Sequence, residues 1–170
     1  MALKKGLTES LEDYLEIILR LQTEQKVARA KDIADGLCVN RGAVTGTLKN
    51  LAQRSLINYE PYSFITLTEK GLRVAREIAR RHKTLKDFLI HVLQVDHVKA
   101  ETAACRMEHA VDKEIIDKFL YFKEFIDACP RTSENWISAY KKYCTTSTPA
   151  WNECRDCLAQ CDIRHQENKP

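Results

Sequence analysis

The stretch from Ala30 to Gln53, AKDIADGLCVNRGAVTGTLKNLAQ, decides the fold of this chain. It predicts a short helix, a tight segment at 38–40 and a second helix with Asn40 at its N-cap. Apolar residues recur at helical spacing in the second helix, at Val44, Leu48 and Leu51. Two short helices joined by a three-residue turn form a helix-turn-helix unit.

The second helix presents small, polar and basic side chains on its other face, as a helix that enters the major groove of DNA requires. A solvated face in a helical bundle is the alternative. The stretch from Val39 to Tyr59 carries three basic residues and no acidic one, which suits a phosphate backbone. The candidate DNA-binding residues are Arg29, Arg41, Gly42, Thr45, Gly46, Lys49 and Asn50.

A β-hairpin is predicted next. Residues 57–62 and 64–68 alternate and are rich in aromatic and β-branched residues, with a turn at Ser63. Before the helix-turn-helix, residues 10–24 predict a helix capped by Ser10. Helix, helix-turn-helix and hairpin make a winged helix. We therefore expect a mainly α fold that begins with a winged helix-turn-helix DNA-binding domain.

The first predicted helix also carries Asp13 and Glu16, three residues apart on one face. Acidic residues in a first helical turn have a simple explanation in the helix dipole. Further along, Thr68 is expected to cap a long helix that runs to Leu93 and carries His82.

A helix is predicted at 97–111, and it carries a group of potential metal ligands. Positions three and four apart share a helix face, so Glu101, Cys105, Glu108 and His109 can converge. Carboxylate, thiolate and imidazole groups together suit a divalent transition metal. The alternative is a core helix with a buried cysteine and a hydrogen-bonded histidine.

The predicted helix at 112–127 has a broad apolar surface, which suggests a dimer interface. The expected domains are a winged-helix DNA-binding domain at 1–72, a helical metal-binding and dimerisation domain at 73–127, and a Cys-rich C-terminal segment at 128–170.

The C-terminal segment holds five of the seven cysteines. A C-x-x-C pair with two further thiols can hold structural zinc or an iron–sulfur cluster. Unligated cysteines packed against aromatic residues are the alternative. The expected ligands of this second metal centre are Cys144, Cys154, Cys157 and Cys161, with Cys129 or His165 as a substitute.

Composition sets the remaining bounds. The chain has 170 residues, 30% of them charged, and a net charge of +3. It contains no apolar run long enough to span a membrane and no signal-peptide pattern, so we expect a cytoplasmic protein with reduced thiols. No nucleophile–base pair or phosphate-binding glycine loop is evident, so catalysis is not expected.

Taken together, residues 7–126 resemble the diphtheria-toxin-repressor/manganese-transport-regulator family of metal-dependent transcriptional repressors. The order and spacing of short motifs along one chain carry this resemblance. They are Ser10-Leu-Glu-Asp-Tyr-Leu-Glu16, Ala28-Arg-Ala-Lys-Asp-Ile-Ala34, Val44-Thr45, Leu67-Thr-Glu-Lys-Gly71, Arg81-His82 and Cys105-Arg-Met-Glu-His109.

The resemblance implies a winged helix followed by a helical dimerisation domain, with a metal at their junction that controls affinity for operator DNA. Carried over position by position, the metal ligands would be Asp13, Glu16, His82, Cys105, Glu108 and His109. Glu101 is a weaker candidate. A thiolate among carboxylates and imidazoles favours iron(II) over manganese(II).

The chain also departs from the family pattern. Manganese-type members usually have a glutamate in place of Cys105, and iron-type members usually have a methionine in place of Asp13. Lys86 stands where iron-type members have an acid of an ancillary metal site. Arg41-Gly-Ala at the start of the recognition helix and Ser63-Phe64 in the wing are also unusual.

The expected function is an iron(II)- or manganese(II)-dependent repressor of metal homeostasis genes that binds operator DNA as a homodimer. The alternative is a redox- or iron–sulfur-sensing winged-helix regulator that uses the C-terminal cysteines.

Overall fold

The computed structural model describes residues 7–128 and 134–147. The chain forms two compact units, which are described separately. One comprises Met1–Lys83 with Cys105–Ala110, and the other Thr84–Ala104 with Val111–Pro170. The short segment Cys105–Ala110 therefore belongs to the same unit as the N-terminal helices, although more than twenty residues separate it from them along the chain.

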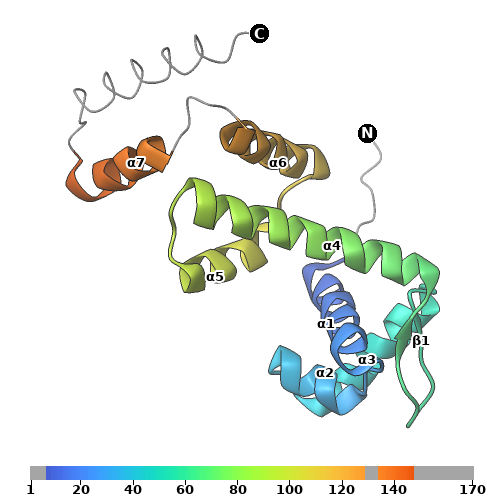
Figure 1. Cartoon of the computed structure of the whole chain (residues 1–170). Helices are drawn as coiled ribbons and strands as arrows, with labels where there is room; N and C mark the ends of the chain where they lie inside the picture. Colours follow the sequence, from blue (N-terminus) through green and yellow to red (C-terminus); the bar gives the residue numbers. More distant parts are fainter. Residues whose placement is uncertain (1–6, 129–133, 148–170) are drawn as a thin grey trace. The chain divides into compact units, whose positions relative to one another are not determined.

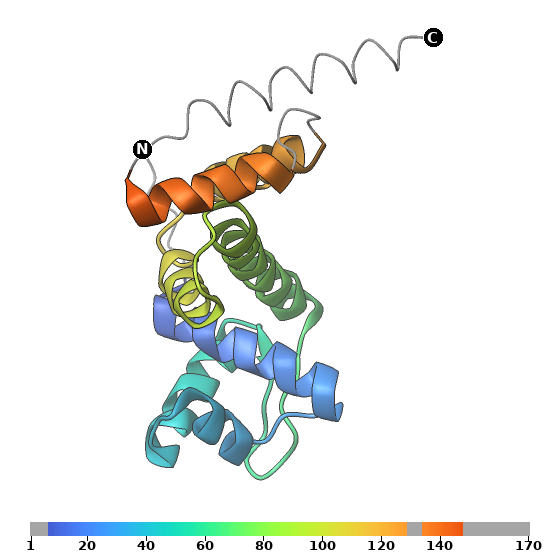
Figure 2. The same cartoon turned by 60° about the vertical axis from the view of Figure 1, so that its left-hand side comes forward.

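The first unit is a winged helix, as predicted. Its elements in chain order are α1 (Glu9–Gln25), α2 (Ala30–Leu37), α3 (Arg41–Gln53), β1 (Ile57–Asn58), β2 (Thr66–Leu67) and the first part of α4 (Glu69–Asp87). Helix α1 packs against α2 and β2, and α3 packs against α2 and β1 (Figures 1 and 2).

Apolar residues at helical spacing form the core of this unit. Leu15 and Ile18 of α1 and Leu48 and Leu51 of α3 are completely buried. Asn40 caps α3, accepting a hydrogen bond of 2.9 Å from the Gly42 backbone N–H, as predicted. Helix α1 begins one residue before Ser10 and has Thr8 at its N-cap, so the expected cap at Ser10 is wrong.

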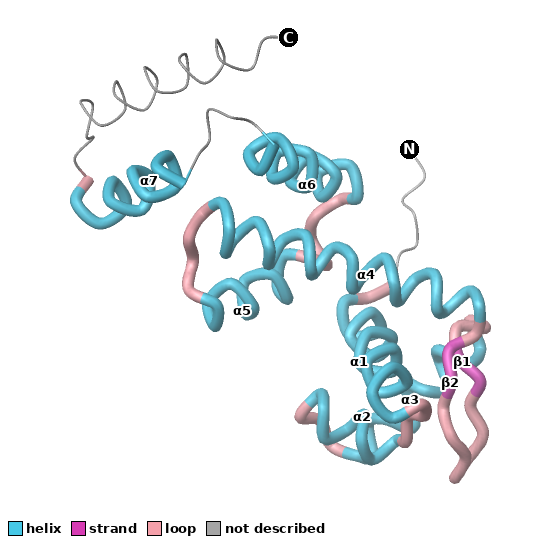
Figure 3. Tube along the Cα trace, viewed as in Figure 1, coloured by secondary structure: helices cyan, strands magenta, loops and turns pink. Residues whose placement is uncertain are grey.

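The hairpin is present but its strands are shorter than predicted. Only Ile57–Asn58 and Thr66–Leu67 pair, with Ile57 opposite Leu67, and one further bridge joins Ala28 to Ile65 (Figure 3). Pro61 has no N–H to donate to a strand partner, and Tyr62 adopts a left-handed conformation with φ of 64°. The wing is therefore a long loop on a short two-stranded base.

Thr68 caps α4 as predicted, its hydroxyl accepting a 3.1 Å hydrogen bond from the Gly71 N–H. The chain is α-helical only to Asp87 and then π-helical over η1 (Phe88–Val92), rather than one α-helix to Leu93.

The second unit contains η1, most of α5 (His97–Met107), α6 (Lys113–Ala128) and α7 (Glu134–Thr146). Helix α6 packs against η1, and the rings of Phe88 and Phe119 meet edge to face with centroids 4.7 Å apart. No helix among the described residues is long and apolar enough to cross a membrane.

Candidate metal centre and DNA interface

The first unit brings titratable side chains from three parts of the chain to one place. Asp13 and Glu16 come from α1, His82 from α4, and Glu108 and His109 from the turn that follows α5. Residues 13 and 16 lie on one face of α1 beside buried Tyr14 and Leu15. The packing of α1 therefore places both carboxylates at the edge of the core.

Glu108 lies at the centre of this group and is fully buried, with 0% of its surface exposed. Its Oε2 lies 2.8 Å from Nδ1 of His82, and its Oε1 lies 3.4 Å from Nε2 of His109. Ligand atoms of Glu16, His82 and Glu108 all fall within 4.8 Å of one another. On the other side, Nε2 of His109 lies 3.0 Å from Oδ1 of Asp13.

Asp13, Glu16 and His109 hold protons more tightly than usual. Burial raises the pKa of Asp13 and of Glu16 above their usual values. Burial alone would lower the pKa of His109, but the hydrogen bond to Glu12 and the negative charges of Glu108 and Asp13 outweigh it and raise that pKa above 6.5. These three groups therefore stay protonated to a higher pH than isolated side chains would.

The donor set fits a divalent cation. Oε1 of Glu108 is buried and has no hydrogen-bond partner among the residues that the structure describes. A buried acceptor left without a partner costs about 1–3 kcal/mol, a cost that a cation at this point would remove. Carboxylate oxygens and imidazole nitrogens are ligands suited to manganese(II) and iron(II).

The structure places the other predicted ligands differently. The Cys105 side chain is exposed, and it is not part of the group formed by Glu16, His82 and Glu108. In the second unit, the Glu101 carboxylate lies 2.6 Å from the Lys86 ammonium. The ligand roles of Cys105 and Glu101 stay predictions.

Of the predicted second metal centre, only Cys144 is described, as an exposed thiol on α7. Cys129, Cys154, Cys157, Cys161 and His165 lie outside the described residues. The zinc or iron–sulfur centre therefore stays a prediction.

Sequence reasoning missed two residues beside the cluster, Glu12 and Arg81. Oε2 of Glu12 lies 2.9 Å from Nδ1 of His109, and Arg81 contacts Glu12. A usable pattern was present, because acids at 9, 12, 13 and 16 follow the i, i+3, i+4, i+7 spacing of one helix face.

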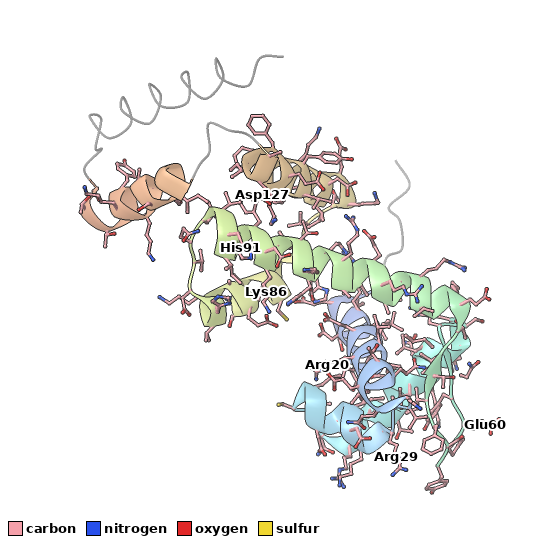
Figure 4. All side chains as sticks on the ribbon, in the orientation of Figure 1. Arg20, Arg29, Glu60, Lys86, His91 and Asp127 are labelled. Atoms are coloured by element: carbon pink, nitrogen blue, oxygen red, sulfur yellow. The ribbon has the colours of Figure 1, made fainter. Side chains whose placement is uncertain are left out.

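The candidate DNA-binding residues are all exposed on the first unit. A groove of about 770 Å³ lies between α3 and the wing, and Arg29, Thr45 and Lys49 line it together with Tyr62 and Phe64. The Arg29 guanidinium lies 5.2 Å from the centre of the Phe64 ring, and Figure 4 shows Arg29 at the start of α2 near the wing. Arg29 and Lys49 thus provide cationic groups in this groove. Arg41 is exposed at the start of α3, where its guanidinium lies 3.9 Å from the Asp35 carboxylate.

Fold and site together define a class of protein, the winged-helix DNA-binding regulators in which the first helix contributes to a carboxylate–imidazole cluster. Two family models match the chain. Residues 6–65 match the N-terminal DNA-binding domain of iron-dependent repressors, and residues 68–137 match their metal-binding and dimerisation domain.

Individual proteins similar to this chain support the same family. An uncharacterized HTH-type transcriptional regulator of Methanocaldococcus jannaschii is 40% identical over 119 residues, which cover 69% of this chain and 95% of that protein. The HTH-type transcriptional regulator MntR of Bacillus subtilis is 34% identical over 121 residues, covering 69% and 84%. The structure of the manganese regulator SloR matches with a TM-score of 0.61 at 27% identity, covering 71% of this chain and 56% of that one.

The chain belongs to the diphtheria-toxin-repressor/manganese-transport-regulator family of metal-dependent transcriptional repressors, which confirms the resemblance seen in the sequence. This family consists of transcriptional regulators rather than enzymes. The chain spans a little over half the length of the matched manganese-regulator structure.

Proposed function

We propose that this chain is a repressor whose affinity for operator DNA rises when iron(II) or manganese(II) binds the cluster of Asp13, Glu16, His82, Glu108 and His109. The buried Glu108 carboxylate carries this proposal, because it faces an imidazole on each side and has one oxygen without a hydrogen-bond partner in the described part of the chain. When bound, a divalent cation would supply the positive charge that the crowded carboxylates lack.

Helix α1 connects the proposed metal site to the DNA-binding elements. Asp13 and Glu16 lie on this helix, while Leu15 and Ile18 of the same helix belong to the core that supports α2 and α3. Ligation at α1 would therefore act on the element that holds the helix-turn-helix. A coupling of about 1–3 kcal/mol corresponds to a roughly 5–150-fold change in DNA affinity.

We also propose that the chain acts as a homodimer through its second unit. Phe88, Ile115, Phe119 and Phe122 line an apolar hollow of about 350 Å³, and 62% of the neighbouring Phe125 is exposed. An apolar surface of this kind is typical of subunit interfaces. Two copies would place two recognition helices on one operator.

The direct test is a DNA-binding measurement on metal-stripped, full-length protein under anaerobic conditions. A duplex selected from a random library by the protein with manganese(II) serves as the operator, and iron(II), manganese(II) and zinc(II) are added singly. Metal should raise DNA affinity about 5–150-fold. Affinity that responds to an oxidant but to none of these metals would contradict the proposal and favour the redox alternative.

Replacing Arg41 or Lys49 with alanine should weaken operator binding, because both side chains are exposed on α3 at the helix-turn-helix. If the replaced residue contacts phosphate, the slope of log affinity against log salt concentration should fall by about one. If it reads a base, the substitution should cost about 1–3 kcal/mol of binding free energy and relax sequence specificity. Fluorescence anisotropy at several salt concentrations distinguishes these cases. Lys141→Ala, at an exposed lysine of α7, removes an equal charge and serves as the control. Unchanged operator binding for both α3 variants would contradict a role for α3 in binding DNA.

Metal affinity should rise with pH. The raised pKa of His109 means that its ring is still protonated somewhat above pH 6.5, so an ion that binds there must displace a proton. Loss of one proton per ion corresponds to about tenfold in affinity per pH unit. Manganese(II) titration calorimetry below and above the pKa of His109 measures the slope, and pH-independent affinity would exclude His109 as a ligand.

A further inference from the structure

The two ring nitrogens of His109 have different surroundings. Nε2 points to the predicted ligands, 3.0 Å from Asp13 and 3.4 Å from Glu108. Nδ1 instead lies 2.9 Å from Oε2 of Glu12. Only 7% of the His109 side chain is exposed, so both sets of contacts form inside the protein.

Glu12 is held in place by Arg81. One guanidinium nitrogen of Arg81 lies 3.3 Å and 3.4 Å from the two carboxylate oxygens of Glu12. Another donates a 2.8 Å hydrogen bond to the backbone carbonyl of Glu108. Arg81 of α4 thus joins α1 to the turn that carries Glu108 and His109.

These contacts make Glu12 a poor metal ligand. Both of its oxygens lie close to the positive charge of Arg81, which repels a cation. Nε of Arg81 is buried without a hydrogen-bond partner among the described residues, a cost of about 1–3 kcal/mol. The contacts of Arg81 to the Glu12 carboxylate and to the Glu108 carbonyl offset this cost.

We propose that Glu12, held by Arg81, is a positioning residue that keeps the proton of His109 on Nδ1 and leaves Nε2 as the metal-binding atom. An ionised carboxylate only accepts hydrogen bonds, so Nδ1 must be the donor to Glu12. A neutral imidazole binds metal through the nitrogen without a proton, and carboxylates that fix this choice raise the basicity of the ligand. The inference rests on the proposed metal-dependent function.

The test uses full-length protein with three substitutions. Glu12→Ala removes the acceptor, Glu12→Gln keeps an oxygen that can accept from Nδ1, and Glu24→Ala removes an exposed acid from the last turn of α1 as a control. Manganese(II) affinity is measured by titration calorimetry. The tautomer of neutral His109 is read from ¹⁵N NMR of metal-free protein, with His109→Asn for assignment.

Glu12→Ala should weaken manganese(II) binding about 10–100-fold and give a mixture of His109 tautomers. Glu12→Gln should restore the single Nδ1–H tautomer and most of the affinity, and Glu24→Ala should match wild type. The inference is overturned if Glu12→Ala binds manganese(II) as tightly as wild type. It is also overturned if wild-type His109 carries its proton on Nε2, a result that does not depend on whether the Glu12 variants fold. Wild-type protein that binds no metal would instead contradict the proposed function.

Discussion

His109→Ala should bind operator DNA with the same affinity whether manganese(II) is present or absent. The substitution removes the imidazole that faces both Asp13 and Glu108, so the proposed metal site loses one of its ligands. The whole metal-dependent gain of about 5–150-fold should disappear. Fluorescence anisotropy with metal-stripped protein, before and after addition of manganese(II), measures the effect.

Glu108→Gln tests the same site with almost no change in shape. The amide keeps an oxygen and the volume of the buried side chain but lacks the negative charge that attracts a cation. It should lose the metal response as His109→Ala does. His91→Ala, at an exposed histidine of η1, should respond to manganese(II) like wild type. A normal metal response in both cluster variants would show that these residues form part of an ordinary core.

Gly71→Ala should destabilise the protein by about 3 kcal/mol or more, at the upper end of what overpacking causes. A Cβ at this position would lie 1.9 Å from the carbonyl oxygen of Leu56 and 2.8 Å from its carbon. Both are backbone atoms, and the same carbonyl accepts a 3.0 Å hydrogen bond from the Thr68 N–H. The start of α4 would have to move away from the segment before β1.

The matched control is Gly46→Ala in the interior of α3. A Cβ there meets nothing within 4 Å, so alanine should stabilise the helix by roughly 0.5–1 kcal/mol. Urea unfolding of both variants, followed by circular dichroism on metal-stripped protein, gives the two free energies. Equal stability of Gly71→Ala and wild type would mean that α4 does not approach Leu56 closely.

The winged helix could be predicted because its determinants are local. Asn40, the tight turn before it and the apolar spacing of α3 each act within a few residues. The predicted hairpin strands were too long for a reason that is also local. The alternating pattern favours longer strands, but Pro61 and the left-handed Tyr62 interrupt their pairing. Helix α7 (Glu134–Thr146) had no counterpart in the prediction.

The cluster could be predicted only in part. Side-chain types and helical spacing pointed to Asp13, Glu16, Glu108 and His109, but periodicity within one helix cannot show that residues of α1 and the turn after α5 meet. The family resemblance supplied that link. The contact between Glu12 and His109 joins positions 97 residues apart and has no counterpart in any local pattern.

Helix α1 performs two tasks with neighbouring residues, since Asp13 faces the cluster and Leu15 the core. An inserted or deleted residue rotates everything beyond it by about 100°, which would turn Glu16 away from the cluster or expose Ile18. The side chain at position 13 can therefore change by substitution during evolution. Insertions and deletions within α1 cannot be tolerated in the same way, because they would rotate either the cluster face or the core face out of place. We expect lineages of such chains to change their metal preference without gaps in this helix.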